Sequence, residues 1–156
     1  MSARRGITKM KRSVWLILNL VMVCLFLGAH FLPIYSIPDG VGAADVFSYV
    51  QSISSSATSL AAFLIFVLLG VALELTALVF FILSAIYGEN QYEKSDKRFG
   101  FGVVIFAFAG GELAMAHLGL KLNYMMFVSL AEAILGILAM IIHFKFFALL
   151  SDRRAQ

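Results

Sequence analysis

The sequence predicts an all-α protein, a four-helix transmembrane bundle with a short amphipathic segment in its first outer loop. Hydrophobic residues make up 62% of the 156 residues and charged residues only 13%, whereas a soluble domain is about half apolar and about a quarter charged. The chain also contains apolar runs of the ~20 residues that a helix needs to cross a bilayer. We therefore expect a single integral membrane domain, residues 1–156.

The first expected helix covers residues 14–33. The segment before it carries five basic residues and no acidic one. The apolar core of this helix is longer than the ~7–15 residues of a signal-peptide core, and no clear small-residue cleavage site follows. We therefore expect a retained membrane helix, anchored at the interface by Trp15 and ended by Pro33.

The first outer loop, residues 34–56, begins with a turn signal at Pro38-Asp39-Gly40. Apolar residues then recur with the spacing of one helix face, at Val46, Phe47, Tyr49, Val50 and Ile53. Two interpretations remain open: a short interfacial helix that lies on the bilayer, or a lid or docking surface for a partner.

Three further helices are expected at residues 57–87, 100–120 and 124–150. As an α-helix the first of these is ~46 Å long, so it must tilt or extend beyond a hydrocarbon core of ~30 Å. Residues 88–99 carry balanced charge and are expected to form a solvated loop. Residues 121–123 are expected to form a tight polar turn.

The basic residues indicate the orientation in the membrane. Five lie in residues 1–13, three in residues 88–99 and three at the C-terminal end, whereas residues 34–56 have none. Basic residues favour the cytoplasmic side, so we expect a multi-pass protein with both termini cytoplasmic. They form no basic patch interleaved with aromatic residues, so we expect no nucleic-acid partner.

Three glutamates lie inside the apolar runs: Glu74, Glu112 and Glu132. Glu112 and Glu132 are each ten positions from Leu122 in the outer turn, and Glu74 and Glu112 lie at similar distances from the 88–99 loop. Three unpaired acids in lipid would cost on the order of 8–10 kcal/mol. We therefore predict that they converge as a buried polar cluster, and that at least one is protonated and donates a hydrogen bond to another.

Other polar residues on these helices are candidate accessory groups. Asn19 and His30 are three turns apart on one helix face, as are Glu132 and His143. His117 lies about 140° around its helix from Glu112 and is expected near the outer surface. Small residues are expected to let the helices pack closely; these are Gly70, Gly110, Gly111, Ala114 and Gly136.

Motifs for chemistry are missing from the sequence. Di-metal carboxylate bundles use Glu-x-x-His, but no glutamate here has a histidine three residues later. Nucleophilic catalysis needs a Ser or Cys beside a base, and Cys24 has no ionisable neighbour on its own helix. We expect no metal, no cofactor and no enzymatic activity.

The expected function is that of a small accessory or scaffolding component of a membrane assembly. Its partners would be the lipid bilayer and either a second copy or a larger membrane protein. The alternative is proton- or cation-coupled transport, or a channel, through the Glu74/Glu112/Glu132 cluster, with His143 on the cytoplasmic side and His30 or His117 on the outer side. A membrane enzyme that acts on lipid is a third, weaker interpretation.

Overall fold

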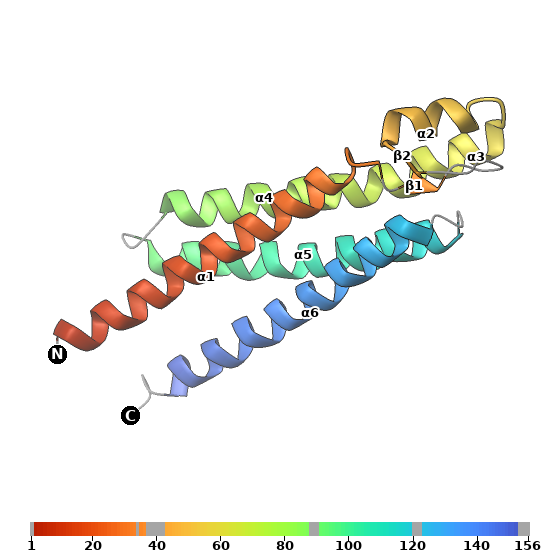
Figure 1. Ribbon diagram of the computed structural model, residues 1–156. Coiled ribbons are helices and arrows are strands. Elements are labelled where there is room, and N and C mark those ends of the chain that lie inside the picture. Colours follow the sequence, from red (N-terminus) through yellow and green to blue (C-terminus); the bar gives the residue numbers. More distant parts are fainter. Residues whose placement is uncertain (1, 34, 37–42, 88–90, 120–122, 153–156) are drawn as a thin grey trace.

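Helices make up almost all of the computed structural model, which describes residues 2–33, 35–36, 43–87, 91–119 and 123–152 (Figure 1). The all-α prediction is therefore confirmed. Two-residue strands β1 (Tyr35–Ser36) and β2 (Ala43–Ala44) pair antiparallel in the first outer loop. The long helices are α1 (Ser2–Ala29), α4 (Leu68–Tyr87), α5 (Tyr92–Gly119) and α6 (Asn123–Asp152).

Three of the long helices form a layer. Helix α5 lies between α4 and α6, whose backbones do not contact each other within the described residues. Helix α1 crosses one face of this layer and packs mainly on α4 (Figure 1). The start of α1 and the end of α6 lie at one end of the molecule, here called the terminal end; α2 (Val46–Ile53) and α3 (Ala57–Ala62) lie at the other, the α2 end (Figure 1).

Helix α1 begins and ends earlier than predicted. The prediction of residues 14–33 treated the basic segment as a tail, but its backbone is helical from Ser2. Lys and Arg are good helix formers, so apolar composition is no requirement for the helix to continue. The helix ends at Ala29, four residues before Pro33, because a proline has no N–H and its ring clashes with the carbonyl of the residue four positions earlier.

The predicted solvated loop at residues 88–99 is wrong over most of its length, because α5 begins at Tyr92. An exposed ion pair between Glu93 and Lys97, 2.9 Å apart with i,i+4 spacing, lies in its first turns. Buried serines then join α5 to α4: the Ser84 hydroxyl donates to the Ser95 carbonyl at 2.8 Å, and the Ser95 hydroxyl donates to the Ser84 carbonyl at 2.5 Å.

The predicted helix at residues 57–87 is present, with an interruption. Helix α3 continues into a π-helical turn, η1 (Phe63–Val67), and then into α4. Each turn of a π-helix contains an extra residue. This turn buries both Phe63 and Val67, which pack against α2 and α5 in one hydrophobic cluster.

The amphipathic segment in the first outer loop forms α2. Asp45 caps it: its carboxylate accepts a hydrogen bond from the Ser48 N–H at 2.8 Å, which holds the pKa of Asp45 below its usual value. Tyr49 and Ile53 are buried, and burial raises the pKa of the Tyr49 phenol. Phe47, predicted on the same apolar face, is instead 71% exposed. Most of that face therefore packs on the protein itself.

Glycines allow the layer to pack closely. A Cβ at Gly110 would collide with the backbone of Ala133, and one at Gly136 would lie 2.7 Å from the Ala107 Cα. Gly70 faces Leu113 in the same way across α4 and α5. The predicted packing role therefore fits these glycines, whereas a Cβ at Gly111 would meet nothing within 4 Å.

Three described stretches are helical, long and apolar enough to cross a membrane: Ala57–Tyr87, Glu93–Leu118 and Tyr124–Lys145. The apolar part of α1 within the searched residues, Ser13–Ala29, is shorter. Helix α6 agrees with the predicted residues 124–150 to within two residues, and α5 ends within one residue of the predicted position.

Candidate functional site

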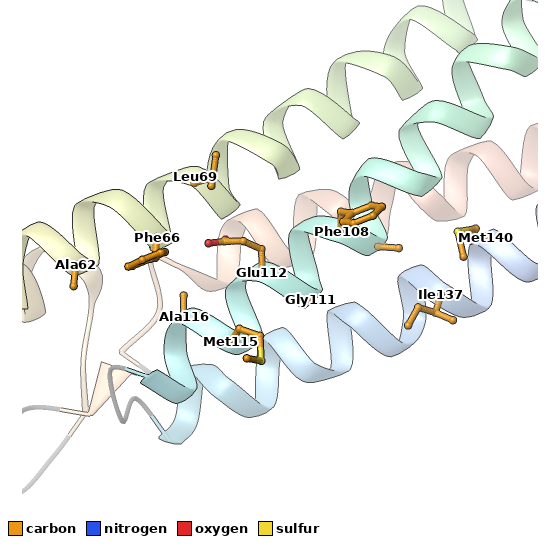
Figure 2. A pocket seen from close by; sticks show the side chains of 11 residues that line it. Ala62, Phe66, Leu69, Phe108, Gly111, Glu112, Met115, Ala116, Ile137 and Met140 are labelled. Atoms are coloured by element: carbon orange, nitrogen blue, oxygen red, sulfur yellow. The ribbon is translucent and has the colours of Figure 1, made fainter.

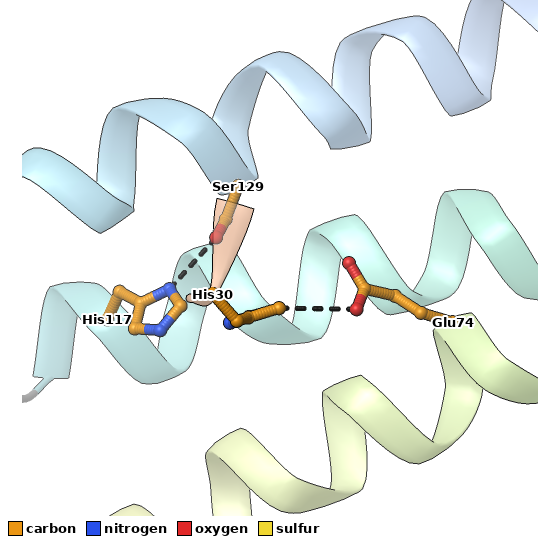
Figure 3. Close-up of polar contacts among 4 residues, drawn as sticks. All are labelled: His30, Glu74, His117 and Ser129. Carbon is orange, nitrogen blue, oxygen red and sulfur yellow. Dashed lines mark hydrogen bonds and ion pairs between the residues drawn. The ribbon is translucent and has the colours of Figure 1, made fainter. Parts of the chain in front are cut away.

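A buried contact between a histidine and a glutamate joins α1 to α4. His30 directly follows the last residue of α1, and its Nε2 lies 3.2 Å from Oε2 of Glu74 in the middle of α4 (Figure 3). His30 is 5% exposed and Glu74 is fully buried. A carboxylate this deep needs a donor or a cation, and His30 can supply either.

A second carboxyl group reaches the same place from α6. Glu132 is 1% exposed and lies within hydrogen-bonding reach of Glu74. Oε1 of each glutamate is buried with no other hydrogen-bond partner among the described residues. Two carboxyl groups in contact and away from water cannot both remain charged, so a proton between them is the chemistry that this contact requires.

Helix α5 contributes His117, which completes the cluster. Its Nδ1 lies 2.9 Å from the Ser129 hydroxyl of α6, and both side chains are almost fully buried. The rings of His117 and His30 are 6.4 Å apart (Figure 3). Helices α4, α5 and α6 and the residue that follows α1 thus supply the buried cluster, which consists of His30, Glu74, His117, Ser129 and Glu132.

The histidine–serine contact in this cluster resembles half of a hydrolytic site. A nucleophilic serine must meet its substrate and a stabilising group for the oxyanion. Ser129 is 1% exposed and His117 is fully buried, so this contact holds α5 to α6. No spacing in the sequence indicates this contact, because the two residues lie on different helices.

Glu112 is the predicted cluster member that the structure places elsewhere. It lies on α5 about 140° around the helix from His117, so it faces away from the cluster. Its Oε2 lies beside Gly70 of α4 and has no hydrogen-bond partner among the described residues. The prediction placed the glutamates at one depth, but the direction of each side chain also decides which ones meet.

The other predicted polar residues lie toward the terminal end. Asn19 is fully buried, and its amide donates to the Trp15 carbonyl at 2.8 Å. His143 is 7% exposed and packs against Phe99, with ring centres 4.9 Å apart. A Cβ at Gly100 would be 3.1 Å from the His143 Nε2. Neither Asn19 nor His143 is part of the cluster.

An open groove follows the face of α5 that α1 does not cover. It has a volume of about 970 Å³, and Figure 2 shows Glu112 pointing from its floor toward the α4 side. Glu112 is the single ionisable side chain of the lining; the other lining residues are Ala62, Phe66, Leu69, Ala107, Phe108, Gly111, Met115, Ala116, Ile137 and Met140. Ala114, predicted as a packing residue, is half-buried on α5 and does not line it.

Among the described residues, no group of three or more His, Cys, Asp or Glu side chains could hold a metal ion. Comparisons of the chain with protein-family models, with curated proteins and with solved structures found no match.

Proposed function

We propose that all four long helices cross the membrane, with both termini and the α4–α5 connection on the cytoplasmic side. Three of these helices have spanning stretches of sufficient length, and α1 runs alongside α4. The start of α1, the start of α5 and the end of α6 lie at the same end of the molecule (Figure 1), and basic residues are concentrated in these parts of the sequence. This distribution of basic residues supports the orientation.

We further propose that the protein is a non-enzymatic membrane component that binds a transmembrane helix of another membrane polypeptide. The groove on α5 is the observation that carries this proposal. Exposed apolar residues alone are ordinary on a surface that faces lipid. A carboxyl group at the floor of an apolar groove is costly in lipid, and a partner that supplies a hydrogen-bond donor or a cation removes that cost.

The shape of the groove also suits a helix. Gly111 lies on its floor with open space around the position of a Cβ, and small residues let transmembrane helices approach closely. Gly110 and Gly136 already serve the contact between α5 and α6, but nothing in the described chain covers Gly111. The expected partner is therefore an apolar helix with one polar or basic residue level with Glu112.

Photo-crosslinking in native membranes tests this proposal. A photoreactive amino acid replaces Phe108 or Met115, which are 69% and 70% exposed on the groove face. The matched control replaces Leu25 on α1, which is 67% exposed away from the groove. We expect protein adducts from the two groove positions and lipid adducts alone from the control.

A blocking substitution distinguishes the groove from a general apolar surface. A Cβ at Gly111 would meet nothing within 4 Å, so Gly111→Leu places its side chain in the groove, and we expect loss of the adducts while the thermal stability of the protein is kept. Adducts of twice the chain mass identify a second copy as the partner. Lipid adducts at every position, or protein adducts that persist in Gly111→Leu, contradict the proposal.

A second candidate function is proton- or cation-coupled transport, which the contact between His30, Glu74 and Glu132 favours. Proton flux into proteoliposomes tests it. Loss of flux in Glu74→Gln and Glu132→Gln, with flux kept in Glu112→Gln, is the result expected of this function. Equal flux in the wild-type protein and in all three variants contradicts it.

A further inference from the structure

At the centre of the buried cluster, two acidic groups, Glu74 and Glu132, lie beside one basic group, His30. Glu74 meets His30 on one side and Glu132 on the other. The other titratable group that faces this centre among the described residues is His117, whose ring is 6.4 Å from that of His30. Two imidazolium ions so close in a buried site would repel each other, so one histidine cation at most balances the carboxylates.

Electroneutrality then fixes the minimum number of protons on the carboxyl groups. A net charge deep in an apolar interior is strongly disfavoured. With His30 as imidazolium, the site is neutral when one carboxyl group is ionised and the other keeps its proton. The close contact between His30 and Glu74 places the ionised group at Glu74, and the proton then lies on Glu132 and is donated to Glu74.

Access to this proton differs between the two ends of the molecule. His30 is the most exposed of the three groups, and the residues that follow it, Phe31, Leu32 and Pro33, are exposed. They follow the end of α1 that lies toward the α2 end of the molecule (Figure 1). His30 is therefore the group of the site nearest the surface of the protein, and its imidazole can accept a proton on one nitrogen and release one from the other.

Toward the terminal end the route is closed by an apolar layer. Buried residues of α1, α4, α5 and α6 lie along their helices between the cluster and His143. This apolar layer consists of Val23, Ala77, Phe81, Val103, Phe106 and Ala139. None of these side chains can carry a proton, so the layer separates the cluster from the terminal end.

We infer that Glu74 and Glu132 share one proton, balanced by a cationic His30, and that this proton exchanges with water only through His30 at the α2 end. In this conformation the buried cluster thus binds and releases a proton at the α2 end of the molecule alone. The inference does not depend on the docking proposal or on net transport. Each exchange conserves protons and the charge of the site: His30 passes its Nε2 proton to Glu74, the carboxyl pair returns a different proton to the ring, and the cationic ring swaps one proton for one from water.

Infrared spectroscopy of the full chain in lipid tests the shared proton, because protonated carboxyl groups have their own carbonyl band. In Glu132→Gln we expect one such band to be lost, because Glu74 and His30 remain as a neutral pair. In His30→Gln we expect one band to be gained, because both carboxyl groups must then be protonated. The matched controls, Glu112→Gln and His143→Gln, leave the bands of the pair unchanged.

Exchange kinetics test the route in the same samples. After transfer to heavy water, the Glu132 band of the wild-type protein shifts as deuterium replaces the proton. We expect His30→Gln to slow this shift by roughly 10²-fold, the scale of one positioned proton-transfer group, and His143→Gln to leave its rate unchanged. The wild-type measurement needs no variant to fold.

Three outcomes overturn the inference: no protonated carboxyl band in the wild-type protein, an unchanged band in Glu132→Gln, or equal exchange rates in the two histidine variants. Circular dichroism of each variant confirms that its helices are retained before its spectra are compared. A failure here leaves the crosslinking test of the groove unaffected, because Glu112 and Gly111 take no part in the site.

Discussion

The two faces of α5 differ in whether an ionisable side chain has a hydrogen-bond partner within the chain. On the face that α1 covers, His117 is fully buried and bonded to Ser129 within the buried cluster. On the open face, Glu112 points into a groove with no hydrogen-bond partner for its buried oxygen among the described residues. Polar groups on the covered face hold this chain together, whereas the buried oxygen of the one on the open face has no hydrogen-bond partner among the described residues.

The largest expected effect separates Glu74 from Glu112. Glu74→Leu leaves His30 and Glu132 buried without their common partner, and we expect a loss of about 2–4 kcal/mol in the free energy of unfolding in detergent. Glu112→Leu replaces a half-buried acid in an apolar groove, and we expect a change within about 0.5 kcal/mol. Chemical denaturation followed by circular dichroism measures both, and equal losses would remove the distinction between the faces.

Neighbouring glycines give the next largest contrast. Gly110→Ala forces a methyl group against the backbone of α6, and we expect a loss of about 1–3 kcal/mol. Gly111→Ala adds the same methyl group in open space, and the better helix propensity of alanine should stabilise the chain by about 0.5–1 kcal/mol. The midpoints of thermal unfolding test this pair, and a stabilised Gly110→Ala would mean that α5 and α6 are farther apart.

A smaller effect tests the contact of α5 with α4 near the terminal end. Ser84→Ala removes one buried hydrogen bond to the Ser95 carbonyl, and we expect a loss of about 1 kcal/mol. Ser54→Ala is the control, because its hydrogen bond to the Gln51 carbonyl is exposed. Denaturation in the same detergent measures both variants, and a neutral Ser84→Ala would show that the serine pair contributes little to the stability of this contact.

The smallest effect concerns α2, which packs on α5 near Leu113 and Ala116. The Ser48 N–H lowers the pKa of Asp45, so the stabilisation from this cap is fully present above the unfolded pKa of about 3.9. It is lost as the pH falls through the lower folded pKa. The Ser48 amide chemical shift, measured by NMR, should titrate below that value in the wild-type protein and stay flat in Asp45→Asn. A flat wild-type curve would contradict the cap.

The periodicity of the sequence predicts the long helices, but it does not predict every contact between them. Charge and apolar length indicated α4, α5 and α6, yet the polar start of α5 at Tyr92 read as a loop because ion pairing with i,i+4 spacing stabilises a helix without apolar residues. The same error shifted the estimated depth of Glu112 relative to Glu74. Geometry of hairpins fixes depth along the bundle, and it leaves the direction of each side chain open.

The contact between His30 and Glu74 illustrates what the sequence could not reveal. Their helices are separated by the whole first outer loop, so no short turn sets their register, and the crossing of α1 over α4 decides which residues meet. Glu132 was within reach of prediction because only three residues separate α5 from α6 in the sequence. The histidine–serine contact between the same two helices needed the direction of both side chains.

The π-helical turn at Phe63–Val67 sets the rotational phase of everything after it in α4. An α-helix turns by about 100° per residue, so the single extra residue in this turn rotates the following helix by that angle relative to α3. If one residue of the turn were deleted, α3 and α4 would become one regular helix. With α3 held by α2, Glu74 would then swing by about 100° away from His30. The π-helical turn therefore determines the direction in which α4 points the carboxyl group of Glu74.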